Sequence, residues 1–347
     1  MPTSRIALIT GVLSLLLTST ARGAVDPPLM ARIGDLPLER GGVITNCQLE
    51  YRTLGTLNAE RTNAVLFPTW FSGRTEQLLD NAGVGKPLDP SRYFIIFVGA
   101  IGNGRSSSPS NSPSQPAAAF PSYTIADMVN AEHRLVTDVL HVSGLHAVIG
   151  ISMGGMQVFE WSVRYPDFAK RFVAIVGTPK LSAYDELLWR TEFGILDRAL
   201  AVHCDEGTKR QVMASVGAVH ELALSTPAHV NATVAPASFD AWLTEREAFY
   251  VSGWDPFDWA SQLQAMLHHD VSARDGGDLS AAAKRVKGRM LAVLAVQDHM
   301  VNPSSAREFV RLAGGRIVDL PGDCGHLANG CEASTVASAV SQFLSEQ

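Results

Sequence analysis

The sequence lacks the excess of positive charge that is typical of proteins that bind nucleic acids. It also lacks the long apolar runs of proteins that span membranes. Its 28 Lys and Arg residues are outnumbered by 34 Asp and Glu residues, which gives a net charge of −6. No basic run interleaved with aromatic residues occurs, so we expect no nucleic-acid partner. The apolar run over residues 6–17 is too short to cross a bilayer, so no stable membrane anchor is expected.

The sequence also lacks internal repeats and motifs that are typical of metal sites. No group of His, Cys, Asp and Glu lies at metal-ligand spacing along the chain, so we predict neither a metal nor another cofactor. Cysteine is scarce, with Cys47, Cys204, Cys324 and Cys331 as its four positions. A bridge between Cys324 and Cys331 would close a small loop around His326, and free buried thiols are the alternative.

The first 23 residues have the layout of a secretory signal peptide. Arg5 precedes the apolar run, and a stretch of small residues leads to Gly23, after which we place the cleavage site. An uncleaved anchor or a merely hydrophobic N-terminus is the alternative. Cleavage would place the mature chain in the periplasm or outside the cell, where its cysteines meet an oxidising compartment.

The chain is organised around a serine between glycines, in residues 150–154 (Gly-Ile-Ser-Met-Gly). An apolar run of strand length, residues 144–149, precedes this motif, and residues 157–166 follow it with helical spacing. The glycines leave no Cβ to collide where a strand turns sharply into a helix. The motif therefore predicts that Ser152 lies at the tip of this turn with its hydroxyl exposed. A glycine-rich turn in an ordinary βαβ unit is the alternative.

Apolar runs of strand length alternate with helical segments along most of the chain. Besides the strand before Ser152, we expect strands at residues 41–53, 63–73 (with its turn), 93–99, 171–177, 290–296 and 316–320. This alternation predicts an α/β fold with a mostly parallel sheet wound on both faces. Residues 103–123, rich in Ser and Pro, are expected to form a long ordered loop. Residues 181–285 show helical spacing only, and we interpret them as a lid between two parts of the core, residues 24–180 and 286–347.

Ser152 needs a base and an orienting acid to act as a nucleophile, because its hydroxyl is protonated at neutral pH. Asp298 follows one predicted strand and His326 follows the next, so both are expected at the carboxyl edge of the sheet. Other acids and histidines compete for these roles. We assign Asp323 to a turn and expect His299 to point elsewhere. His268 and His269 are expected on a solvated helical face.

Acyl transfer also requires donors for the developing oxyanion. Met153 opens the helix after Ser152, so its backbone N–H has no partner within the helix. The loop that leaves the strand at residues 63–73 is expected near the serine, which makes the N–H of Trp70 the second donor. The alternative is that Trp70 and Phe71 simply form core or pocket wall.

These segments resemble the homoserine O-acetyltransferase family of α/β-hydrolases over nearly the whole chain after residue 23. The most specific parts are residues 150–156, Glu160-Trp161, residues 165–167, and Leu88-Asp89 before Tyr93-Phe94. The resemblance implies an α/β-hydrolase fold and a helical lid that often serves as a homodimer interface. It also implies the roles given above to five residues: Ser152, Asp298, His326, Trp70 and Met153.

Two features depart from this family at the expected acceptor site. Leu327 follows His326, where the family typically has an acidic residue that helps hold the amino group of homoserine, and Gln264 stands where a basic residue is usual. Arg190 would be the lid residue for a substrate carboxylate, although its register is shifted by one. We name Phe71, Arg190 and Leu327 as the substrate-binding residues.

The expected location bears on the reaction. Acetyl-CoA is a cytosolic cofactor, so an exported enzyme would have no supply of it. The sequence therefore predicts hydrolysis of a carboxylic ester or a related small acyl compound through an acyl-enzyme on Ser152. An acyl-CoA-dependent O-acyltransferase is the alternative, favoured if the N-terminus is not cleaved. A non-catalytic binding module is a further alternative, against which the intact set of Ser152, Asp298 and His326 argues.

Overall fold

The computed structural model describes residues 27–201 and 205–346. The segment that we predict to be a signal peptide lies outside these residues, and so does Cys204. Within the described part of the chain, no helix is both long and apolar enough to cross a membrane.

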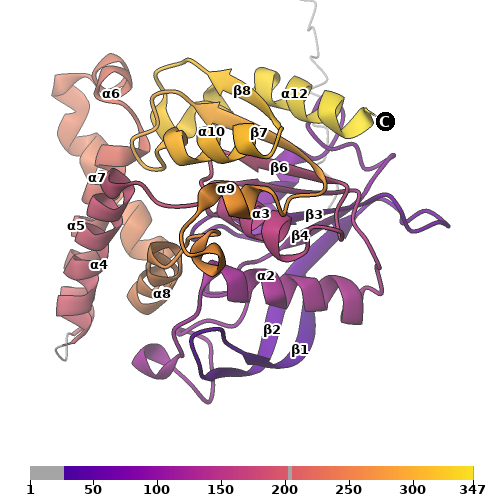
Figure 1. The fold of residues 1–347 in the computed structure, drawn as a ribbon. Helices are drawn as coiled ribbons and strands as arrows, with labels where there is room; N and C mark the ends of the chain where they lie inside the picture. The colour runs from indigo at the N-terminus through magenta and orange to yellow at the C-terminus, as the bar shows by residue number, and fades with distance from the viewer. Residues whose placement is uncertain (1–26, 202–204, 347) are drawn as a thin grey trace, which may run out of the picture.

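An eight-stranded sheet forms the centre of the molecule, in the order β1-β2-β4-β3-β5-β6-β7-β8 (Figure 1). The six strands from β4 to β8 are parallel, whereas β2 pairs antiparallel with both β1 and β4. The predicted mostly parallel sheet is thus confirmed. The strands are β1 (Leu29–Pro37), β2 (Val43–Leu54), β3 (Ala64–Pro68), β4 (Phe94–Val98), β5 (Ala147–Ile151), β6 (Arg171–Ile175), β7 (Arg289–Ala295) and β8 (Arg316–Leu320).

Helices cover both faces of this sheet. Every residue of β3, β5 and β6 is buried, as expected for parallel strands between two helical layers. One apolar cluster joins α2, α3 and α10 to one face, and a second joins α1 and α12 to the other. The helices of the core are α1 (Thr75–Leu78), α2 (Ile125–Arg134), α3 (Met153–Arg164), α9 (Leu279–Ala283), α10 (Pro303–Leu312), α11 (Ala328–Cys331) and α12 (Ala333–Ser345).

Among the described residues, six α-helices lie between β6 and β7, and all of them except α9 stand to one side of the sheet (Figure 1). Their starts follow from sequence, because each of α4, α5, α6 and α8 has a Ser, Thr or Asp side chain that accepts a hydrogen bond from its first turn. The insertion consists of α4 (Ala183–Leu200), α5 (Glu206–Leu224), α6 (Pro227–Thr233), α7 (Phe239–Gly253) and α8 (Pro256–Leu267).

Two expectations differ from the structure. β1 was not predicted, because Gly34 adopts a positive φ of 73° and the pairing with β2 shifts register there, which breaks the alternation that marks a strand. His269 does not lie on a solvated face, although His268 is exposed. The Nε2 atom of His269 lies 3.0 Å from the carbonyl oxygen of Thr178. Burial lowers the pKa of His269 to about 4, so it is a neutral core residue.

Candidate active site

Ser152 sits at a strained turn between β5 and α3. Its φ of 58° and ψ of −120° are unusual for a residue with a side chain. The two glycines make room for this turn, because a Cβ on Gly150 would lie 2.1 Å from the carbonyl oxygen of Gly154. A Cβ on Gly154 would lie 2.8 Å from the carbonyl oxygen of Pro68 at the end of β3. The absence of a side chain at Gly154 therefore lets the end of β3 pack closely against the turn that carries Ser152.

A chain of hydrogen bonds links the three residues that the sequence singled out. The Nε2 atom of His326 lies 2.8 Å from Ser152 Oγ, and its Nδ1 atom lies 2.7 Å from Asp298 Oδ2. All three residues are buried. The other carboxylate oxygen of Asp298 accepts hydrogen bonds from the backbone N–H groups of Met300 and Val301, at 2.9 and 2.8 Å. The carboxylate is thus fixed on both oxygens, and the imidazole is held between acid and hydroxyl.

The helical insertion holds the loop that carries Asp298. Trp189 of α4 donates its indole N–H to the carbonyl oxygen of Met300, at 3.2 Å. Asp185, one turn earlier, accepts a hydrogen bond from the N–H of Asn302 at 2.9 Å. Burial raises the pKa of Asp185, and the nearby Asp298 carboxylate acts in the same direction.

The loop after β3 is anchored from three directions. Thr69 donates its N–H to Val98 at 3.0 Å, and its carbonyl oxygen accepts from the buried side-chain amide of Gln157 in α3 at 3.1 Å. Gln262 of α8 accepts a hydrogen bond from the N–H of Ser72 at 2.7 Å. Among the described residues, the backbone N–H groups of Trp70 and Met153 have no acceptor. Two free donors therefore remain beside Ser152.

Ser152 opens into a cavity of about 300 Å³, at the small end of ligand pockets. Within the described chain, its lining includes the polar groups Ser72, Gln77, His220 and Asn329, but no Lys, Arg, Asp or Glu. Most of its wall is aromatic, with rings from the β3 exit loop and from the insertion: Trp70, Phe71, Trp189, Phe249, Tyr250, Trp254 and Trp259. Such a wall suits small uncharged molecules.

A second histidine–carboxylate pair in this wall was not found from the sequence. His220 of α5 lines the cavity, and its Nδ1 atom lies 3.1 Å from the fully buried carboxylate of Glu192 in α4. The His220 ring stacks on Phe71, with 5.9 Å between centroids. The sequence signal is weak, because His220 and Glu192 stand 28 residues apart in two different helices and neither belongs to a motif.

The other residues named from the sequence divide between pocket and surface. Phe71 and Leu327 line the cavity, whereas Arg190 does not. Arg190 is exposed and pairs with Glu186 one turn away on α4, because the neighbouring Trp189 takes the inward-facing position. The assignment of Arg190 to substrate binding is therefore wrong for this structure. His299 is exposed, as expected.

Asp323 pairs with His229 rather than with His326, at 3.3 Å. Cys324 and Cys331 are joined by a disulfide, and Cys47 is a buried free thiol. Burial raises the pKa of Cys47 to about 11, so this thiol stays protonated.

Comparison with known proteins places the chain among α/β-hydrolases, with esterases and acyltransferases as relatives. A family model described as the alpha/beta hydrolase fold matches residues 68–200. A probable esterase of Corynebacterium glutamicum is 35% identical over 86% of this chain and 88% of its own. An ethyl acetate hydrolase of Pseudomonas veronii is 36% identical over 75% of this chain and 77% of its own.

Acyltransferases are similar over a comparable length. Homoserine O-acetyltransferase of Caulobacter vibrioides is 30% identical over 89% of this chain and 92% of its own. The crystal structure of the acetyl esterase MekB superimposes with a TM-score of 0.86, at 29% identity, over 92% of this chain and 97% of that one. The chain therefore belongs to the α/β-hydrolase family, in the group that contains esterases and homoserine O-acyltransferases.

Proposed function

We propose that this protein is a carboxylic ester hydrolase that acts through an acyl-enzyme on Ser152 and accepts small uncharged esters. The observation that carries this proposal is the cavity beside Ser152, which is aromatic and, among the described residues, has no Lys, Arg, Asp or Glu in its lining. The names of two relatives, a probable esterase and an ethyl acetate hydrolase, support the same reaction.

The proposed reaction begins when Ser152 Oγ attacks the ester carbonyl carbon while His326 Nε2 takes the hydroxyl proton. Asp298 stabilises the imidazolium and holds its orientation. The N–H groups of Trp70 and Met153 donate to the oxyanion. The tetrahedral intermediate collapses, and His326 returns the proton to the leaving alcohol. Water then attacks the acyl-enzyme with His326 as base, which releases the acid and restores Ser152.

The alternative is transfer of an acyl group from a coenzyme A thioester to an alcohol. Homoserine carries both an ammonium and a carboxylate, and coenzyme A carries phosphates, so both need charged partners when they are bound in a pocket. The cavity offers none within the described chain, and Leu327 adds an apolar side chain beside His326. This is why we place hydrolysis first.

Export of the enzyme is part of the proposal and rests on residues 1–23 alone. N-terminal sequencing of protein recovered from the periplasm or the medium tests it. A chain that begins at Ala24 is expected, whereas an intact Met1 in the cytosolic fraction would contradict export. Retention in the cytosol would also strengthen the acyltransferase alternative.

We also propose that two copies associate through the insertion. Five of its large apolar side chains are at least 45% exposed: Tyr184, Leu187, Leu222, Phe239 and Phe249. Light scattering on the purified protein tests this by its molar mass. We expect twice the mass of the chain, which is 37.2 kDa before any signal peptide is removed. A Leu187→Glu and Leu222→Glu double variant should be monomeric, and a wild-type monomer at micromolar concentration would refute the association.

The central test compares p-nitrophenyl esters of rising acyl length with acetyl-CoA plus homoserine. We expect turnover of short esters, loss of at least about 10³-fold on Ser152→Ala, and little consumption of acetyl-CoA. Ser162→Ala is the matched control, because Ser162 lies on α3, the helix that follows Ser152, and its hydroxyl donates to the carbonyl oxygen of Phe159. Undiminished ester turnover by Ser152→Ala would refute the nucleophile, and faster acetyl transfer to homoserine would favour the alternative.

A further inference from the structure

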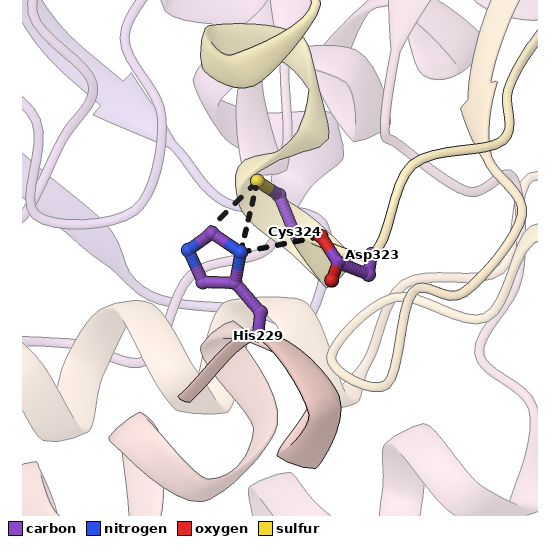
Figure 2. A group of neighbouring side chains, drawn as sticks. All are labelled: His229, Asp323 and Cys324. Carbon is purple, nitrogen blue, oxygen red and sulfur yellow. Dashed lines mark hydrogen bonds and ion pairs between the residues drawn. The ribbon is translucent and has the colours of Figure 1, made fainter. Parts of the chain in front are cut away.

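Three side chains that can ligate a metal converge at the loop before His326, and none of them lines the aromatic cavity. His229 comes from α6, and Asp323 and Cys324 come from the loop that leads into His326 (Figure 2). The Nδ1 atom of His229 lies 3.3 Å from Asp323 Oδ1 and 3.5 Å from Cys324 Sγ. The ligand atoms of all three residues lie within 4.8 Å of one another. No sequence pattern predicts this group, because His229 lies 94 residues before Asp323 and 95 before Cys324.

The two separations from His229 Nδ1 match the edges of a tetrahedral zinc site. Bonds of about 2.0 Å from zinc to nitrogen and oxygen, and about 2.3 Å to sulfur, place ligand atoms about 3.3 Å apart for N and O and about 3.5 Å apart for N and S. The observed distances are 3.3 and 3.5 Å. A carboxylate and a thiolate would also neutralise the charge of a divalent ion.

In the structure the sulfur of Cys324 is bound to Cys331 and is not a thiolate. Cys331 is exposed, whereas Cys324 is buried. A dithiol reductant can therefore attack the sulfur of Cys331, and the electron pair of the disulfide then passes to Cys324. The second thiol of the reductant resolves the mixed disulfide, leaves oxidised dithiol and releases Cys331 as a thiol. The departing Cys324 thiolate forms beside the imidazole of His229.

We propose that reduction of the Cys324–Cys331 disulfide creates a Zn²⁺ site with His229 Nδ1, the Asp323 carboxylate and Cys324 Sγ as ligands. Water or the thiolate of Cys331 takes the fourth position, and binding displaces a proton from the Cys324 thiol. The sulfur of Cys324 can either form the disulfide or bind the metal as a thiolate, so the two states exclude each other. The inference is independent of the proposed ester hydrolysis.

This site would join two parts of the molecule that already touch. The hydroxyl of Thr226, which caps α6, donates to the carbonyl oxygen of Asp323. A Cβ on Gly325 would lie 3.0 Å from Ser225 Cα, so the His326 loop packs directly on the corner between α5 and α6. The ion would therefore fasten the insertion to the His326 loop.

Cys331→Ser provides the direct test, since it frees the Cys324 thiol without any reductant. Titration with Co²⁺ should give one equivalent of binding, with ligand-field bands of a four-coordinate ion and a thiolate charge-transfer band, and Zn²⁺ should displace the cobalt. The Cys331→Ser/His229→Ala variant should lose these bands. Cys331→Ser/His268→Ala is the matched control, because His268 is an exposed histidine away from the cluster.

The oxidised wild type should show no thiolate band, and the wild type treated with a dithiol should gain it. Cys324→Ser/Cys331→Ser keeps Cys47 and Cys204, so binding by this variant would assign the metal to another thiol and overturn the proposal. Equal binding by the His229→Ala and His268→Ala variants would also overturn it. Thermal melting of each variant checks that a lost band does not reflect a lost fold.

Discussion

Replacing Gly154 by Ala should slow catalysis, because the added methyl group would displace the backbone at the end of β3. The added Cβ would lie 2.8 Å from the carbonyl oxygen of Pro68, where ordinary contact begins at 3.4 Å. The end of β3 must therefore move by about 0.6 Å, and Trp70, two residues later, moves with it. A misplaced catalytic group of this order costs about 10–10²-fold in rate, and complete loss of an oxyanion donor costs about 10²–10³-fold.

Single-turnover acylation by p-nitrophenyl acetate measures this effect, because it isolates attack by Ser152. We expect the acylation rate and kcat to fall about 10–10²-fold while KM changes less, since the donor acts on the transition state. Gly144→Ala is the matched control, with its Cβ 3.5 Å from the carbonyl oxygen of Phe168. A folded Gly154→Ala protein that keeps kcat within twofold of wild type would refute the reasoning.

A second variant decides the case if Gly154→Ala does not fold. Gln157→Leu removes the amide that holds the carbonyl oxygen of Thr69 from α3 without adding bulk at the turn. It should lower kcat about tenfold with little change in KM. Gln157→Glu, which keeps an acceptor and loses the donor, should behave like the Leu variant. An unchanged kcat in both variants would show that α3 does not position the loop.

Three further outcomes are expected. Asp298→Asn should lower kcat by at least about 10²-fold, whereas Asp319→Asn, an exposed aspartate in β8, should not; equal effects would remove Asp298 from the mechanism. Trp189→Phe keeps a ring in the cavity but loses the hydrogen bond to Met300, so kcat should fall several-fold with KM nearly constant, and a change confined to KM would contradict a positioning role. Burial raises the pKa of Glu132 from 4.5 to about 8, so the folded protein holds a proton that the unfolded chain releases between these values. Stability relative to Glu132→Gln should therefore be greatest below about pH 4.5 and fall by a few kcal/mol as the pH rises to about 8; urea titrations that show a pH-independent difference would refute this.

The serine turn and the order of the partners could be predicted because local patterns determine them. Glycines around Ser152 are needed wherever a strand turns into a helix at a strained residue. The positions of Asp298 and His326 follow from the rule that parallel strands end at one edge of the sheet. These inferences require only strand boundaries, which continuous apolar runs such as β5 and β7 mark clearly.

The pocket could not be predicted in the same way, because it depends on how helices pack. The sequence places Trp189 and Arg190 side by side, and only the rotation of α4 against the core decides which one faces inward. His220 meets Glu192 across two helices, and a sequence pattern has no access to such pairs. His269 was misplaced for a similar reason: it lies just past the end of α8, where the chain turns back to the sheet and buries it against Thr178.

The insertion between β6 and β7 contributes both to the substrate cavity and to the positions of the proposed catalytic groups. Its helices supply most of the aromatic wall of the cavity, and the same α4 holds the Asp298 loop through Trp189 and Asp185. Its α8 holds the β3 exit loop through Gln262. A substitution that repacks these helices for a larger ester therefore also moves the orienting acid and an expected oxyanion donor. Changes in substrate range should come from wall residues without such hydrogen bonds. Phe249 is the clearest of these, since its side chain has no hydrogen-bonding atom and its ring lies against the rings of Tyr250 and Trp254.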